Sequence, residues 1–242
     1  AQDISATKRA EQERLAHEAS QRDALVREVH HRIKNNLMGV IGLLRQHIFD
    51  QPDLRDPLEA AIAQINTISV VHGLQGRLPR KEPGLRDLVE EVARAAATLA
   101  LMPRRPAIDD RLNSDIRLDS GAAVNIALIL NELVQNALKH GRPGDDTHVT
   151  ISLAGDASRL GIGIVNPGGP LPADFDLPTG RGCGTGLGLA RTLLPRHGAS
   201  LRITGDGGNV CAILELSPPV TSDPTPPAFH QPDALSYRED AS

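Results

Sequence analysis

Two adjacent histidines, His30 and His31, lie in the charged stretch EVHHRIKNNL at residues 28–37. A neutral imidazole near pH 7 is a competent nucleophile. Helical side chains turn by about 100° per residue, which places His30 beside the apolar stripe of this segment and His31 roughly 150° from its centre. Asn35, one turn later, projects beside His31. We therefore expect His31 to be an exposed nucleophile, although an incidental histidine pair on a solvated helix explains this stretch alone equally well.

A second group of polar side chains lies in NELVQNALKHG, residues 131–141. Glu132, Asn136, Lys139 and His140 fall on one face of a helix whose opposite face is apolar. An asparagine carbonyl can bind Mg²⁺, a lysine can neutralise phosphate, and Glu132 could orient a metal-bound water. A surface helix with mixed polar residues is the simpler explanation of this segment when it is read alone.

A glycine-rich stretch, GRGCGTGLGL at residues 180–189, leads into a predicted helix. Glycines let backbone N–H groups approach a phosphate, and a helix N-terminus favours an anion. The stretch lacks the GK[ST] of a Walker A motif, and no strand plainly feeds it as in a dinucleotide-binding turn. A flexible loop with a helix cap would explain it equally well.

The composition limits the classes of function. The chain has 242 residues, with 26 basic and 30 acidic side chains and a net charge of −4, which argues against a nucleic-acid partner. Its two cysteines cannot build a disulfide framework, and no apolar run approaches the length of a transmembrane helix. The chain begins at Ala1, so we interpret it as a fragment of a longer protein, and we expect this part to be cytoplasmic.

The sequence predicts a helical hairpin that carries the histidine pair and, after it, an α/β domain that carries the other two motifs. Residues 1–50 predict one long helix that ends at Gln51-Pro52, and residues 57–78 predict a second. A hairpin of this length cannot bury a two-sided apolar stripe alone, so a homodimeric four-helix bundle is the simplest solution. The stripe on the first helix has coiled-coil-like spacing and comprises Val26, Val29, Ile33, Leu37, Val40, Leu44 and Ile48.

The remaining elements predict a two-layer α/β sandwich, giving an α + α/β fold class overall. Helices are expected over residues 85–101, 122–140 and 186–197, with Asp119 and Ser120 as cap candidates for the second. Strands are expected over residues 148–153, 159–165, 201–204 and 210–216. Residues 218–242 are rich in Pro, Asp and Ser, which predicts a disordered tail or a linker.

Taken in order, HHRIKNNL, NELVQNALKHG and GTGLGLA resemble the bacterial two-component sensor histidine kinases. The resemblance covers roughly residues 20–217 and is closest to the subgroup with an HHRxKNNL phosphoacceptor box, related to the HWE kinases. It implies that residues 1–20 are a signalling helix that leaves an upstream PAS-like sensor domain, and that residues 21–79 form a dimerisation and phosphotransfer hairpin. Residues 80–217 would be an ATP-binding domain of the GHKL (Bergerat) fold.

The resemblance also implies roles for particular residues. His31 would accept the γ-phosphoryl group of ATP and pass it to an aspartate of a response-regulator receiver domain, with Glu132, Lys139 and Asn35 as further catalytic candidates. Asn136 would hold Mg²⁺. The implied nucleotide-binding residues are Asn136, Lys139, His140, Asn166, Gly168, Arg181, Gly184, Thr185, Gly186, Leu187 and Gly188.

Some residues depart from the family pattern. Asn166 and Pro170 stand where the family has an aspartate and a glycine, and the W-x-E feature of the HWE group is absent because the chain has no tryptophan. A neutral amide is a weaker acceptor for the adenine amino group than a carboxylate. An active kinase is our main expectation, and a degenerate module that relays phosphoryl groups or binds a partner without ATP is the alternative. In either case Asn35 could position water for dephosphorylation of the regulator.

Overall fold

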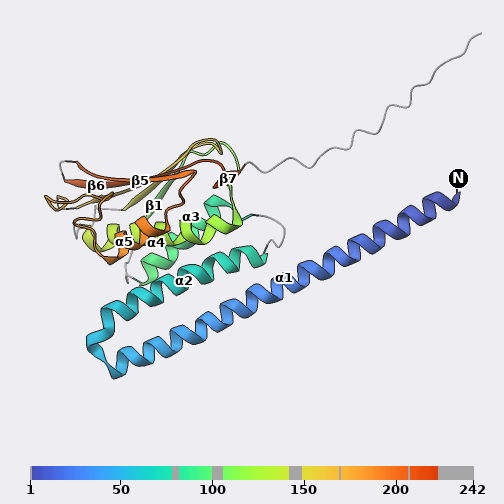
Figure 1. The fold of residues 1–242 in the computed structure, drawn as a ribbon, viewed down its shortest axis with the longest axis horizontal. Helices are drawn as coiled ribbons and strands as arrows, with labels where there is room; N and C mark the ends of the chain where they lie inside the picture. Colours follow the sequence, from blue (N-terminus) through green and yellow to red (C-terminus); the bar gives the residue numbers. More distant parts are fainter. Residues whose placement is uncertain are drawn as a thin grey trace, which may run out of the picture.

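The computed structural model describes residues 2–77, 82–99, 106–141, 149–168, 170–206 and 208–222, and it consists of a long helical hairpin packed against an α/β domain (Figure 1). The elements in chain order are α1 (Gln2–Asp50), η1 (Pro52–Leu54), α2 (Arg55–Arg77), α3 (Leu85–Leu99), β1 (Ala107–Asp110), β2 (Arg117–Leu118), α4 (Ser120–His140), β3 (Thr150–Gly155), β4 (Leu160–Pro167), α5 (Thr185–Leu193), β5 (Ala199–Asp206), β6 (Asn209–Leu216) and β7 (Thr221–Ser222).

The hairpin is closed by a small apolar cluster near its turn. Pro52 ends α1 because a proline disfavours helical geometry in the residue before it. Ile41 and Ile48 of α1 pack with Ile62 of α2, and half-buried leucines and an isoleucine surround them. Helix α1 continues well beyond the end of α2 (Figure 1). Only part of the predicted stripe is covered, because Val29 and Val40 remain 54% and 42% exposed.

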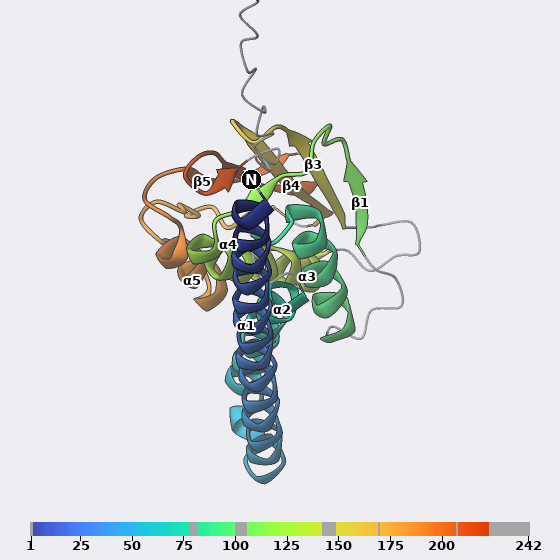
Figure 2. The ribbon, with the colours of Figure 1, turned by 90° about the vertical axis from the view of Figure 1, so that its right-hand side faces the viewer.

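The α/β domain has two layers, with α3, α4 and α5 on one face of a five-stranded sheet (Figure 2). The strand order is β1-β3-β4-β6-β5, where β1 is parallel to β3 and all other neighbours are antiparallel. Leu160, Ile162 and Ile164 alternate along β4 and are buried in the core, and Asn166 continues this buried row. Strand β4 therefore places one polar side chain, that of Asn166, at the edge of the apolar core.

Helix α4 is the central helix of this domain. Asp119 caps it by accepting hydrogen bonds from the backbone N–H groups of Gly121 and Ala122, as predicted. Its length and composition would suffice for a membrane span, but most of its surface is buried within the protein, as in the core helix of a folded domain. Helix α2 packs against both α1 and α4 and lies between them (Figure 1).

Several sequence expectations need correction. The helix predicted over residues 186–197 ends at Leu193, because Pro195 forces the preceding Leu194 into an extended conformation. Strands β1, β2 and β7 were not predicted. Strand β7 falls in the segment expected to be a tail, and there Thr221 is buried and donates a 2.6 Å hydrogen bond to the carbonyl of Ala157. The rest of the predicted tail, residues 223–242, lies outside the described residues, as do residues 100–101 and 148.

Candidate functional site

Helix α4 presents the second motif as the sequence predicted, with one difference. Its apolar side is fully buried in the core, while Lys139 and His140 are exposed and Asn136 is half-buried. Glu132, expected on the same polar face, is only 9% exposed. The carboxylate is covered because two other elements, α2 and α5, meet α4 at this point.

Gln64 and Gly186 are the neighbours that enclose Glu132. The Gln64 amide on α2 donates a 3.3 Å hydrogen bond to Glu132 Oε1. On the other side, a Cβ added to Gly186 in the first turn of α5 would collide with Glu132 Oε2. Burial raises the pKa of the Glu132 carboxyl, and the Gln64 hydrogen bond acts in the opposite direction. The sequence motifs did not single out Gln64, which lies far from them in the chain.

The glycine motif begins α5 beside the polar face of α4. Gly184 is the N-cap residue and offers no side-chain cap to the first turn. The first N–H groups of a helix have no intrahelical partner, so they remain available to an anion. The Asn136 amide nitrogen lies 4.0 Å from the position of a Cβ on Gly186. The structure therefore brings the second and third motifs together.

The end of β4 adds Asn166 and Gly168 to the same region. Gly168 forms a β-bridge with Gly141, the residue that follows α4, and a Cβ on Gly168 would lie 3.2 Å from the carbonyl oxygen of His140. Asn166 is 4% exposed, two residues before this contact. The predicted adenine-binding residue is thus held at the C-terminal end of α4.

Buried amide groups without partners indicate what this region could bind. The Nδ2 atoms of Asn136 and Asn166 are buried and have no hydrogen-bond partner among the described residues. An unsatisfied buried polar group costs about 1–3 kcal/mol, which a ligand could recover. The Asn136 amide can also turn to present Oδ1 to a cation without losing a bond from Nδ2. These residues fit a nucleotide and its Mg²⁺.

The segment before α5 is folded on itself. Arg181 forms a 3.6 Å ion pair with Asp176 and donates to the Thr179 hydroxyl. Arg191 of α5 donates a 3.1 Å hydrogen bond to the carbonyl of Pro178, which attaches the segment to the helix. Among the described residues, no hydrogen bond or ion pair joins the Arg181 side chain to α4 or α5. Arg191, which the sequence reasoning did not identify, is the residue that anchors this segment.

The first motif lies on α1, away from these residues. His31 is exposed and its Nδ1 lies 3.3 Å from the Asn35 amide nitrogen, as the helical spacing predicted. His30 is half-buried and contacts His72 of α2 instead. The two adjacent histidines therefore occupy different environments, and of the two His31 is the one exposed on the helix surface.

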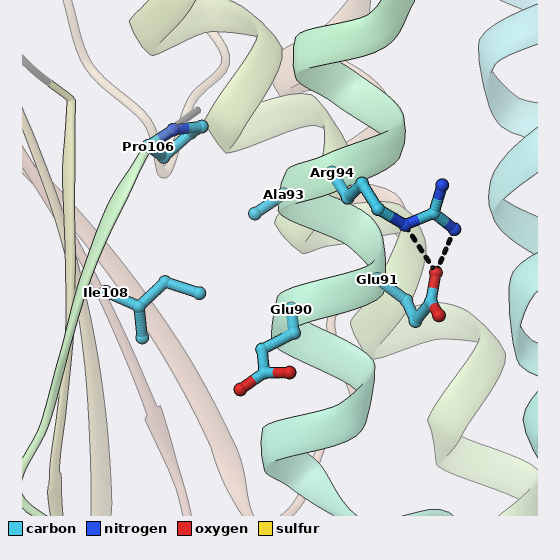
Figure 3. A pocket seen from close by; sticks show the side chains of 6 residues that line it. All are labelled: Glu90, Glu91, Ala93, Arg94, Pro106 and Ile108. Carbon is cyan, nitrogen blue, oxygen red and sulfur yellow. Dashed lines mark hydrogen bonds and ion pairs between the residues drawn. The ribbon is translucent and has the colours of Figure 1, made fainter. Parts of the chain in front are cut away.

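A cavity of about 260 Å³ lies between α3 and β1 (Figure 3). Glu90 and Ile108 line it, together with Arg94, which is paired with Glu91. It contains none of the predicted site residues. The residues predicted to bind the nucleotide are instead gathered around α4, where Gly186 of α5 approaches Glu132 and Gly168 pairs with Gly141.

The arrangement of these elements is typical of one group of enzymes. A two-layer α/β domain with a polar helix face beside a glycine-rich helix start, joined to a helical hairpin with an exposed histidine, is the arrangement expected of a protein-histidine kinase. Comparison with known proteins agrees. A family described as "Histidine kinase" matches residues 28–77, and one described as "Histidine kinase-, DNA gyrase B-, and HSP90-like ATPase" matches residues 121–220.

Curated relatives point the same way. The sensor histidine kinase PdtaS of Mycobacterium tuberculosis is 29% identical over 177 residues, which are 72% of this chain and 35% of that protein. PdtaS of Mycolicibacterium smegmatis is 28% identical over 196 residues, which are 79% of this chain and 38% of that protein. The chain thus spans little more than a third of these relatives.

The histidine kinase domain of the blue-light activated histidine kinase EL346 from Erythrobacter litoralis has a similar fold. It superposes with a TM-score of 0.54 at 17% identity, covering 80% of this chain and 91% of that one. Residues 28–77 and 121–220 therefore match families of histidine kinases and of GHKL-type ATPases, and the chain is similar to two-component sensor histidine kinases.

Proposed function

We propose that this chain transfers the γ-phosphoryl group of ATP to His31 and then to an aspartate of a response-regulator receiver domain. The observation that carries the proposal is the meeting of Glu132, Asn136 and Gly186 around α4, with Asn166 at the end of the same helix. In the reaction a ring nitrogen of His31 forms a bond to the γ-phosphorus. The bond from phosphorus to the β–γ bridging oxygen breaks, ADP leaves with that electron pair, and the imidazole proton passes to water.

Different residues would bind the adenine, the metal ion and the phosphates. Asn166 accepts from the adenine amino group through its amide oxygen, and Gly168 lets the backbone approach the base. Asn136 would hold Mg²⁺, which when bound neutralises phosphate charge. Glu132 orients a water near that position, and Lys139 neutralises phosphate as a point charge. The remaining contacts to phosphate come from His140, Arg181, Gly184, Thr185, Leu187 and Gly188.

Asn35 would control the ionisable ring of His31. A hydrogen bond at Nδ1 fixes which ring nitrogen carries the proton. In the structure the Asn35 amide nitrogen faces Nδ1. When the amide turns so that its oxygen accepts from Nδ1–H, the proton stays on Nδ1 and the Nε2 lone pair is free to attack phosphorus. The same amide could position water for dephosphorylation of the regulator. An Asn35→Ala variant with intact His31 that dephosphorylates its partner normally would remove this second role.

Partners and organisation are also proposals. We assign residues 21–79 to a dimeric hairpin, residues 80–217 with their continuation to Ser222 to the ATP-binding domain, and residues 1–20 to the connection from an upstream sensor, all in the cytoplasm. Exposed apolar side chains on α1 support a second copy as the occupant of that surface: Leu25, Val29, Met38, Val40, Leu43 and Phe49. Light scattering after size exclusion should give twice the mass of one chain.

The degenerate module without ATP turnover is the alternative, and the neutral Asn166 and Pro170 are the residues that favoured it. The kinase relatives and the intact surroundings of Asn136 favour the active enzyme. Calorimetric titration with ATP and Mg²⁺ separates the two. We expect heat of binding in the wild-type chain and its loss in Asn136→Ala; a wild-type chain with no affinity for ATP would contradict the proposal.

A further inference from the structure

Helix α2 of the hairpin contributes a side chain to the region assigned to the nucleotide. Gln64 is half-buried where α2 packs on α4, and its amide nitrogen lies 3.3 Å from Glu132 Oε1. Among the described residues, Gln64 is the one hydrogen-bond donor to the Glu132 side chain. The two residues are 68 positions apart in the chain, so only the docking of the hairpin on α4 brings them together.

Glu132 has little freedom to find another partner. Gly186 at the start of α5 lies so close to Oε2 that a single added carbon would collide with it. Only 9% of the residue is exposed, so water satisfies little of its hydrogen-bonding capacity. A buried carboxylate without a hydrogen-bond donor is unfavourable. Without the Gln64 donor, the Glu132 side chain would therefore turn away or change its position relative to α5.

We propose that Gln64 is a positioning residue of the nucleotide site, which fixes the Glu132 carboxylate against the first turn of α5 and makes the site complete only while the hairpin is docked. This inference rests on the proposed function, because it assigns Glu132 to phosphoryl transfer. It adds that the hairpin supplies part of the nucleotide site in addition to the phosphoacceptor. Nucleotide chemistry and hairpin position are then coupled through one hydrogen bond.

The test is the initial rate of autophosphorylation as a function of ATP concentration in the whole chain. Gln64→Met keeps the length of the side chain and removes the donor, and Gln64→Glu adds charge repulsion. Gln64→Lys retains an N–H donor of similar reach. Gln75→Met is the matched control, because Gln75 is on the same helix and is also half-buried. Thermal unfolding confirms that each variant is folded.

We expect kcat to fall about tenfold in Gln64→Met, the scale of one lost hydrogen bond to a charged group, and further in Gln64→Glu. KM for ATP should stay within about twofold, because the proposal gives Gln64 a bond to Glu132 and none to the nucleotide, and Gln64→Lys should recover most of kcat. Gln75→Met should match the wild type. An unchanged or increased kcat in Gln64→Met, or an effect confined to KM, overturns the positioning role. A wild-type chain that takes no label overturns the proposed function itself.

Discussion

His30 and His72 are joined across the hairpin, with their Nδ1 atoms 3.0 Å apart and their ring centroids separated by 5.3 Å. Gly76 permits this approach, because a Cβ there would lie 3.2 Å from His30 Cβ. A hydrogen bond between two Nδ1 atoms requires one ring to donate and the other to accept, so at least one imidazole must be neutral. The pair therefore links α1 to α2 one residue before His31, the proposed phosphoacceptor.

Acidification should weaken this link. Burial, together with the nearby His30, lowers the pKa of His72 below that of a free histidine. The unfolded chain then binds a proton more readily than the folded chain, so stability is full above about pH 6.5 and declines as the pH falls below it. The melting temperature of the wild type should drop between pH 7.5 and 5.5 by more than that of His72→Leu. Equal drops in the two proteins would contradict this.

Gly186→Ala should destabilise the ATP-binding domain. The new Cβ collides with Glu132 Oε2, so the buried carboxylate must move and lose its hydrogen bond from Gln64, which costs about 1–3 kcal/mol. The melting temperature should fall by about 2–4 °C for each kcal/mol in a protein of this size. Gly188→Ala is the control, because nothing lies within 4 Å of its Cβ position and alanine favours a helix by about 0.5–1 kcal/mol. A Gly186→Ala protein as stable as Gly188→Ala would show that Glu132 does not pack against α5.

Asn166→Asp should strengthen binding of adenine nucleotides. A carboxylate accepts from the adenine amino group more strongly than an amide, by about 1 kcal/mol, which corresponds to an affinity gain of about fivefold. Calorimetry with ADP measures it, and GDP serves as the control because guanine carries an oxygen at the corresponding ring position. An ADP affinity that falls, or an equal gain for GDP, would refute the assignment of Asn166 to the base.

The arrangement of helices predicts which histidine is phosphorylated. Helix α2 lies between α1 and α4, so the His31 that meets the docked nucleotide site should be that of a second chain (Figure 1). His31→Gln and Asn136→Ala chains, inactive alone, should therefore complement each other when co-expressed with different tags. Label should appear on the Asn136→Ala chain. If the mixture stays unlabelled while wild-type protein is labelled, transfer occurs within one chain.

The spacing of apolar residues predicted the two long helices and predicted that His30 flanks the core while His31 faces solvent. Both predictions succeeded because helical geometry relates residues that are close in the chain. The His31–Asn35 contact is separated by four residues, and a helical wheel suffices to find it. Strand β1 was missed for the opposite reason. Its four residues are largely exposed and alternate only weakly, so its identity as a strand comes from parallel pairing with β3 more than forty residues later.

Burial of Glu132 shows the same limit at the site. The motif correctly placed Glu132 on the face of α4 that carries Asn136, yet its exposure depends on α2 and α5. Gln64 belongs to no motif and carries no local signal of a role. Likewise, β7 could be recognised only from its pairing with β2 and the hydrogen bond from Thr221 to Ala157. Long-range packing decided each of these features.

The most direct test of the account is to map the acid-labile phosphoryl group after incubation with γ-labelled ATP and Mg²⁺. Wild type, His31→Gln and His30→Gln should be compared side by side, with Asn136→Ala as the control for the nucleotide site. We expect label in wild type and His30→Gln and none in His31→Gln or Asn136→Ala. Label that persists in His31→Gln would show that another residue accepts the phosphoryl group, and a wild-type chain that remains unlabelled would show that the chain is not a histidine kinase.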